Sequence, residues 1–368
     1  MKQLSKWLFV ALLPLLLALV VPAAAGKLTP TRSVPVNGEI SGLAFDGPRV
    51  VYGVRPYGVA SQSVHAWNVL SGNTSVVHRR GGGVAFAVAS NRVAWIARGG
   101  SPSETDEYLL TTPLPRLHLR QVATAVRHDA HEAGPEIGNW LSGLTGSGNA
   151  IAVSSWTTGP GDSMSNGRLS LVGTHGLKPI VSGRDAIVAE SLDAGRIAVA
   201  RSTSLWPSHY RLSGGDGSVA VYSTSGKLLL EVNRGTAKEA ALSGNTLAVL
   251  TTTNTIQLYD AKTGAFVRSR PVPLRAAHLD LQAGIAIYSV YGKYAGPRAL
   301  HILQLRTGKD IVLARAVGPY AYAQGDDAQI DELGVVYAVN KRPGTRRSHI
   351  VFVPMGRVLT ALSKAHVR

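Results

Sequence analysis

Aromatic and basic side chains are concentrated in the long polar segments that separate the apolar runs of this sequence. Flat rings can contact sugars or peptides, and guanidinium groups match carboxylates or phosphates. The alternative is that the rings pack the segments against one another and the charges are solvated. The candidate ligand-binding residues are Tyr57, Trp206, His209, Tyr210, Tyr291, Tyr294, Arg298, Arg342 and Arg346.

One segment combines histidine with carboxylates. His128, His131 and Glu132 are ligand types that suit zinc or another transition metal. Their spacing is not that of a His-Glu-x-x-His helix, and Gly134 and Pro135 favour a loop. The three residues are therefore candidate metal ligands, and the alternative is a polar, solvated connection.

Other carboxylates could serve hydrolysis or calcium binding. Two suitably placed carboxyl groups hydrolyse glycosides, but no spacing rule selects a pair here. Asp331 and Glu332 follow Asp326 and Asp327 at a spacing that fits no EF-hand loop. The sequence has no Gly-x-Ser-x-Gly motif and no cysteine, which argues against acyl transfer at such a serine elbow and excludes a thiol nucleophile. Polar candidates in the long segments are Glu104, Asp106, Asp162, Asp216 and Asp326.

The first 25 residues have the pattern of a secretory signal. Lys2 and Lys6 precede an apolar run at 8–21, and Ala23-Ala24-Ala25 forms a small-residue cleavage site. The apolar run is short for a membrane-spanning helix, and no later segment is apolar enough to span. An uncleaved anchor is the alternative. We expect a secreted or envelope protein with no transmembrane segment after cleavage.

The charge balance is strongly basic. Lys and Arg number 38 and Asp and Glu 22, for a net charge of +16. Such a protein is attracted to anionic surfaces. The basic residues are scattered, whereas a nucleic-acid binder would cluster them, so nucleic acid is not the expected partner. With no cysteine there is no disulfide framework, and stability must come from a large core.

A short apolar segment recurs seven times, and each copy follows a tight turn of Gly, Asn, Asp or Ser. A four-stranded propeller blade is repeated at about 40 to 50 residues, and alternating strands bounded by such turns are typical of hairpins. The sequence predicts an all-β fold, a β-propeller of seven four-stranded blades over 39–368, preceded by a lead-in segment at 26–38. The second blade is the weakest copy, with its third strand expected at 107–110. The seven segments are 49–54, 92–97, 150–154, 196–200, 246–250, 284–288 and 334–338.

The turns resemble those of known bacterial propeller repeats. Leu258-Tyr-Asp-Ala-Lys-Thr-Gly264 is similar to the turn of quinoprotein-type repeats, and 305–309 and 222–227 look like degraded copies. The resemblance extends loosely to TolB-like and WD40-like secreted propellers and implies the fold only. The chain lacks the tryptophan that follows the quinoprotein Thr-Gly, the adjacent cysteine pair and any Trp-Asp dipeptide. We therefore expect no cofactor.

The predicted connections are long on one side of the ring. Six of the seven links from second to third strand are long, and the first and third turns of each blade are tight. Because binding residues concentrate on loops held by a rigid scaffold, we expect the long-loop face to bind a ligand. The leading hypothesis is a monomeric, non-catalytic binding module for a protein or an anionic or carbohydrate envelope polymer. The alternative is a polysaccharide lyase or hydrolase with its site at the channel mouth. The long links are 55–62, 98–106, 157–167, 203–217, 291–298 and 340–348.

Overall fold

The computed structural model describes most of the chain after the predicted signal sequence, which lies outside the described residues. The described ranges are 31–56, 62–101, 104–115, 117–128, 137–159, 164–202, 217–233, 235–291, 298–317, 328–340 and 347–365.

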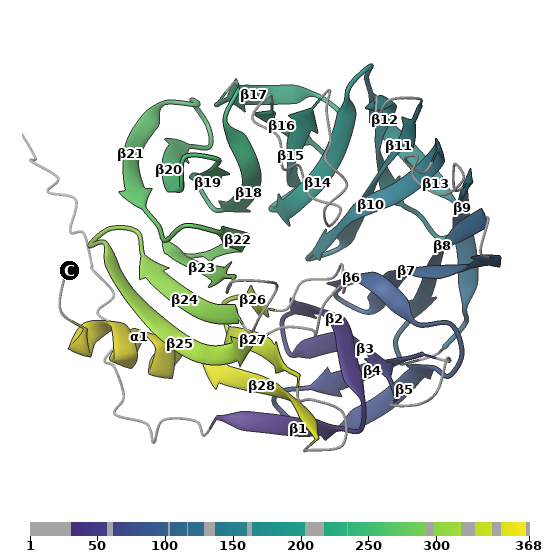
Figure 1. Ribbon diagram of the computed structural model, residues 1–368, viewed down its shortest axis with the longest axis horizontal. Helices are drawn as coiled ribbons and strands as arrows, with labels where there is room; N and C mark the ends of the chain where they lie inside the picture. The colour runs from purple at the N-terminus through teal and green to yellow at the C-terminus, as the bar shows by residue number, and fades with distance from the viewer. Residues whose placement is uncertain are drawn as a thin grey trace, which may run out of the picture.

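Seven antiparallel blades surround a central channel (Figure 1), which confirms the predicted β-propeller. Blade 1 contains β2 (Glu39–Asp46), β3 (Arg49–Arg55), β4 (Ser63–Asn68) and β5 (Thr74–His78). Blade 2 contains β6 (Gly83–Ala89), β7 (Arg92–Ser101), β8 (Glu104–Pro113) and β9 (Arg120–His128). Blade 3 contains β10 (Ile137–Ser147), β11 (Ala150–Thr158), β12 (Met164–Val172) and β13 (Leu177–Ser182). Blade 4 contains β14 (Ala186–Asp193), β15 (Arg196–Ser202), β16 (Ser218–Ser223) and β17 (Leu228–Val232).

The remaining blades follow the same order from the channel outward. Blade 5 contains β18 (Ala237–Ser243), β19 (Thr246–Thr251), β20 (Thr255–Asp260) and β21 (Phe266–Pro271). Blade 6 contains β22 (Ala276–Gln282), β23 (Ile285–Val290), β24 (Arg298–Gln304) and β25 (Lys309–Val317). Blade 7 contains β26 (Ala328–Ile330), β27 (Gly334–Val339), β28 (Ser348–Pro354) and, as its outer strand, β1 (Arg32–Val36).

Strand β1 closes the ring. It pairs antiparallel with β28, with Val34 opposite Ile350, so the two ends of the propeller share one blade. Figure 1 shows the two strands side by side. The sequence places this stretch in a lead-in segment, whereas in the structure it is the fourth strand of blade 7.

The recurring apolar segments form the second strand of every blade. Their side chains are buried on both faces because each blade is covered by a neighbour on either side, as with Val50 and Val51 at 0% exposure. The core therefore lies between blades: one cluster joins Val50 and Trp67 of blade 1 to Val336 and Phe352 of blade 7. Large buried interfaces of this kind can stabilise a chain that has no disulfide.

Blade 2 is complete, and its strands are longer than the sequence suggests. The third strand, expected at 107–110, is β8, and it pairs with β7 along its whole length from Glu104 to Pro113. The predicted long link at 98–106 is therefore mostly strand, because Gly99 and Gly100 extend the ladder. The predicted link at 157–167 is shorter for the same reason, since β12 begins at Met164.

Each inner strand is tied to the preceding or following blade by a polar side chain. At six interfaces a side chain accepts a hydrogen bond from a backbone N–H of the next inner strand, and at the seventh Ser41 Oγ donates to the Gly83 carbonyl at 2.9 Å. Inner strands carry β-bulges, which free backbone N–H groups from the ladder. The six accepting contacts are Glu107–Leu141, Ser154–Ala189, Ser191–Leu242, Glu239–Leu279, Asp280–Ile330 and Gln329–Phe45.

A short helix, α1 (Met355–Lys364), follows the last strand. Val358 and Leu362 are its buried residues, one turn apart on one face, and they pack in the cluster between blades 6 and 7. The sequence predicts an all-β fold, and this helix departs from it with only those two buried apolar positions. Among the described residues, no helix has the length and apolar character required to cross a membrane.

Candidate functional site

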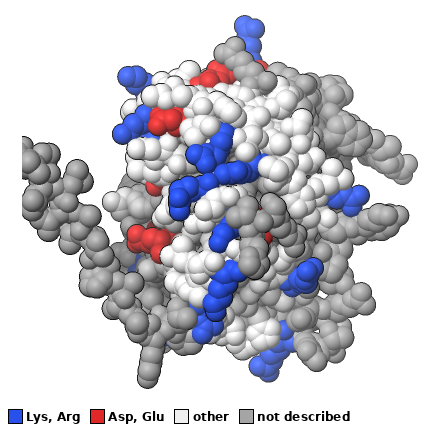
Figure 2. All heavy atoms as spheres, turned by 90° about the vertical axis from the view of Figure 1, so that its left-hand side faces the viewer, with Lys and Arg blue, Asp and Glu red and all other residues white. Residues whose placement is uncertain are grey.

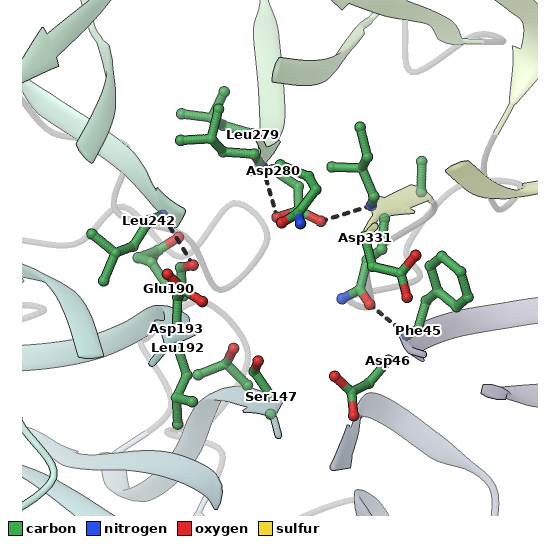
Figure 3. Close-up of a pocket in the computed structure, with 18 of the residues that line it drawn as sticks. Phe45, Asp46, Ser147, Glu190, Leu192, Asp193, Leu242, Leu279, Asp280 and Asp331 are labelled. Atoms are coloured by element: carbon green, nitrogen blue, oxygen red, sulfur yellow. Dashed lines mark hydrogen bonds between the residues drawn. The ribbon is translucent and has the colours of Figure 1, made fainter. Parts of the chain in front are cut away.

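A polar cavity of about 100 Å³ lies in the channel, where the inner strands end and the first tight turns begin. The sequence predicts a ligand site on the opposite, long-loop face. No Lys or Arg is among the described residues that line the cavity. Figure 3 shows Asp46 and Asp331 on one side of the cavity, with Glu190 and Asp193 opposite. The carboxyl side chains of the lining are Asp46, Glu190, Asp193, Asp280 and Asp331.

Three of these carboxyl groups occupy the same position in their repeats. Each lies three residues before the first residue of the second strand, so the propeller symmetry brings them to one level of the channel. The other blades carry small or neutral residues there. The seven equivalent residues are Asp46, Ala89, Ser147, Asp193, Ser243, Gln282 and Asp331.

Asp46 reaches two other blades. Its carboxylate accepts hydrogen bonds from Ser90 N at 3.0 Å and Gly148 N at 3.4 Å. Burial raises the pKa of Asp46, and the two backbone N–H groups oppose that rise. The side chain thus joins the turns of blades 1, 2 and 3.

Asp193 and Asp280 have comparable roles. Asp193 Oδ2 accepts from Gly244 N at 2.7 Å and lies 3.7 Å from Arg196 Nη2. Asp280 Oδ2 accepts from Ile330 N at 2.9 Å. Both carboxylates satisfy backbone donors of the following blade, which is a structural role.

Asp331 differs from the other carboxyl groups. Its Oδ1 accepts from Leu333 N at 2.7 Å and Gly334 N at 3.2 Å, as expected in a turn. Its Oδ2 is buried and has no hydrogen-bond partner in the described part of the chain. Burial, together with the charges of Asp46 and Glu332, raises the pKa of Asp331 to about 7. This carboxyl group can therefore gain or lose a proton near neutral pH, as an acid–base catalyst must.

His278 is the basic group of the cavity lining. It has a backbone φ of +58°, which is uncommon for a residue other than glycine, and it lies in a bulge of β22. Its Nε2 is within hydrogen-bond distance of the Tyr291 hydroxyl, and the two rings are stacked at 5.6 Å. Tyr291, one of the predicted ligand-binding residues, is thus partly buried against the channel wall.

Most of the other predicted ligand-binding residues lie outside the described residues. These are Tyr57, Trp206, His209, Tyr210, Tyr294, Arg342 and Arg346. Arg298 begins β24, where its backbone pairs with Val317. Their convergence on the long-loop face stays a prediction.

The predicted metal-ligating segment is described only at its start. His128 is the last residue of β9, and its Nδ1 lies 3.7 Å from Glu104 Oε2 in an exposed pair. His131 and Glu132 lie outside the described residues. Within the ranges that the structure describes, no three His, Asp or Glu side chains are grouped as a metal site requires.

Basic side chains cover the outer side of blades 5 and 6. Figure 2 shows Lys and Arg residues across the side of the molecule formed by β21, β25 and α1. Arg270 donates from Nε to the Leu305 carbonyl at 3.0 Å and from Nη2 to the Arg306 carbonyl at 2.9 Å. Arg268 Nη1 donates to the same Arg306 carbonyl at 3.2 Å. We call Arg268, Arg270 and Arg306 the arginine cluster; none of them has a carboxylate partner among the described ion pairs.

The comparisons with known proteins show the fold alone. No family model matches the chain, and no curated protein matches it. The β-propeller domain of the Trilobed protease from Pyrococcus furiosus, described as having an open velcro topology, aligns with a TM-score of 0.54 at 11% identity over 85% of this chain and 95% of that one. The computationally designed Ika8 protein aligns with a TM-score of 0.47 at 15% identity over 87% and 98% of the two chains. In this chain, by contrast with the open description, β1 closes the ring.

Proposed function

We propose that this chain is an exported, non-catalytic propeller that binds an anionic polymer of the cell envelope. The observation that carries the proposal is the arginine cluster, which lacks carboxylate partners among the described residues, on a chain of net charge +16. The backbone carbonyls of 305 and 306 hold the guanidinium groups of Arg268 and Arg270 in place. Since a guanidinium has five N–H donors, donors remain for phosphate or carboxylate oxygens.

The carboxylates of the channel support the non-catalytic part of the proposal. Asp46, Asp193 and Asp280 each accept a hydrogen bond from the backbone of another blade. Groups engaged in this way stabilise the ring and are poorly placed to exchange protons with a substrate. The predicted long-loop residues would add sugar or peptide contacts.

The test is binding of the purified chain, from residue 26 onward, to soluble polyphosphate and to poly-glutamate. The Arg268→Glu/Arg306→Glu variant should bind both polymers about tenfold or more weakly, because two favourable contacts become repulsive. The control is Arg79→Glu/Arg80→Glu, which makes the same change of charge at exposed residues of blade 1. Equal loss in the two variants would show that only net charge matters and would reject the arginine cluster as the binding surface.

A polysaccharide lyase or hydrolase is the second candidate. The observation that favours it is Asp331, which lies in the same cavity as His278, has a pKa raised to about 7, and has an Oδ2 without a hydrogen-bond partner among the described residues. Acidic and neutral polysaccharides should be screened for turnover. Activity that disappears in Asp331→Asn, with the fold retained, would replace the binding module by an enzyme.

A further inference from the structure

Blades 2 and 3 are joined at the edge, and a slot lies beside the junction. Strand β9 pairs with β10 at only two positions, His128 with Ile137 and Arg127 with Gly138, which merges the two blades into one eight-stranded sheet. Beyond those pairs the strands separate, because β10 turns inward to pair with β11 (Figure 1).

The two walls of the slot are joined at both ends. At one end are the two β9–β10 pairs. At the other end, Arg120 Nη1 contacts the Thr174 carbonyl at 3.2 Å and His175 Nδ1 at 3.0 Å. Between them is a cavity of about 560 Å³, which is within the range of about 300–1,000 Å³ for ligand pockets. It is lined by β9 on one side and by all four strands of blade 3 on the other.

One wall of the slot is a strand edge. β9 is the outermost strand of blade 2, and its other edge is paired with β8. From Gln121 to Val126, the outer edge of β9 pairs with no other described strand. Six residues of strand extend over about 20 Å, which is enough to pair with a short extended peptide.

The other wall presents hydrogen-bond donors. The guanidinium of Arg168 is exposed and has no partner among the described residues. Asn139 Oδ1 accepts from Thr157 Oγ1 at 3.0 Å, which leaves its NH₂ group without a described partner. Among the described residues, the lining contains no Asp or Glu.

We propose that this slot binds an extended peptide segment of a partner protein that carries a carboxylate, by strand addition to β9. The peptide backbone continues the pairing that β10 begins at Arg127 and His128, as in other cases of β-augmentation. The carboxylate pairs with Arg168, and a carbonyl oxygen of the peptide accepts from the NH₂ group of Asn139 on the opposite wall. This site is separate from the arginine cluster and does not depend on the proposed polymer binding.

The test begins with a randomised seven-residue peptide library displayed on phage and selected against the purified chain. Selected peptides should be enriched in Asp and Glu, and their synthetic forms should bind at least tenfold more weakly to Arg168→Glu. Lys178→Glu is the matched control, because Lys178 is an exposed residue of neighbouring β13 that does not line the slot. Circular dichroism checks that both variants keep the fold.

Amide hydrogen exchange locates the bound peptide. Binding should slow exchange in 120–128 without a comparable effect at 228–232, an outer strand of blade 4. Selection of no peptide, equal binding to Arg168→Glu and wild type, or protection elsewhere would each overturn the proposal. Binding of trigalacturonate at the slot in place of any peptide would also overturn it, by assigning the donors to an acidic sugar.

Discussion

Arg98 and Glu107 form an ion pair of 2.9 Å in which the glutamate side chain is only 1% exposed. Glu107 Oε1 accepts from both Nε and Nη2 of the arginine, while Oε2 accepts from Leu141 N at 2.8 Å. One carboxylate therefore connects two strands of blade 2 to the inner strand of blade 3. The sequence places Arg98 at the start of a binding loop, whereas the structure places it in an interface between blades.

Replacing Glu107 by alanine should destabilise the propeller by about 3 kcal/mol or more. The change leaves the Leu141 N–H and the partly buried guanidinium without their acceptor. Urea unfolding of the variant and the wild type measures the difference. Glu104→Ala is the control, because Glu104 is exposed and should change the free energy of unfolding by less than about 0.5 kcal/mol. Similar values for the two variants would contradict the assigned role.

Asp331 should make stability fall as the pH rises from about 4 to 7. Its pKa is raised to about 7 in the folded chain, from an ordinary value of 3.8, so the folded state holds the proton more tightly. Its contribution is complete below the ordinary value and is lost as the pH rises through the folded value, by at most about 4 kcal/mol. Asp331→Asn keeps the acceptor for the turn and should lose this slope in urea unfolding at pH 4, 5, 6, 7 and 8. Asp46, whose pKa is also raised, supplies a residual slope in the variant. An unchanged slope would show that Asp331 is ionised throughout.

A disulfide between β1 and β28 should stabilise the ring. Ser33 and Val351 are paired across the two strands, and paired Cα atoms in an antiparallel ladder are close enough for a disulfide. The Ser33→Cys/Val351→Cys variant should gain about 3 kcal/mol under oxidising conditions, because the unfolded chain is constrained. Thermal unfolding with and without a reducing agent isolates the effect, since the chain has no other cysteine. A melting temperature that the reducing agent does not change, despite complete oxidation, would argue that the β1–β28 closure does not limit stability.

Tyr291 should contribute to stability through its hydroxyl group. Tyr291→Phe keeps the ring stacked on His278 but removes the hydrogen bond to Nε2, at a cost of about 1 kcal/mol. Guanidinium unfolding gives the value. Loss of polymer binding with unchanged stability would instead support the role that the sequence predicts for this residue, a ligand contact.

The fold could be predicted because its core strands are self-similar. Segments such as 197–200 and 247–250 are apolar at every position, as strands covered on both faces must be. Closure of the ring could not be predicted in the same way. β1 is five residues long, contains Pro35, and is partly exposed, so nothing local identifies a partner at the far end of the chain.

The channel carboxylates were visible in the sequence but were interpreted differently. Asp46 and Asp193 lie in the tight turns that precede the recurring apolar segments, and Asp331 belongs to the group considered for calcium binding. Placing the seven repeats in register would have brought these three to one level, since each precedes its second strand by the same number of residues. The buried Oδ2 of Asp331, which has no hydrogen-bond partner among the described residues, could not be predicted, because it depends on tertiary packing. Ligand binding by the long-loop face stays a prediction from the sequence.

Because both ends of the propeller contribute strands to blade 7, the ring cannot close until the end of the chain has been synthesised. Ile40 N donates to Asn340 Oδ1, and the two residues are 300 positions apart. At about 5–20 residues per second, a ribosome needs about 15–60 s to synthesise the chain between them. Throughout that interval the inner strand of blade 1 lacks the strands of blade 7 that later pack against it. The unfinished propeller is an open arc with two uncovered apolar faces, so a nascent chain of this kind depends on protection from aggregation until its final strands are made.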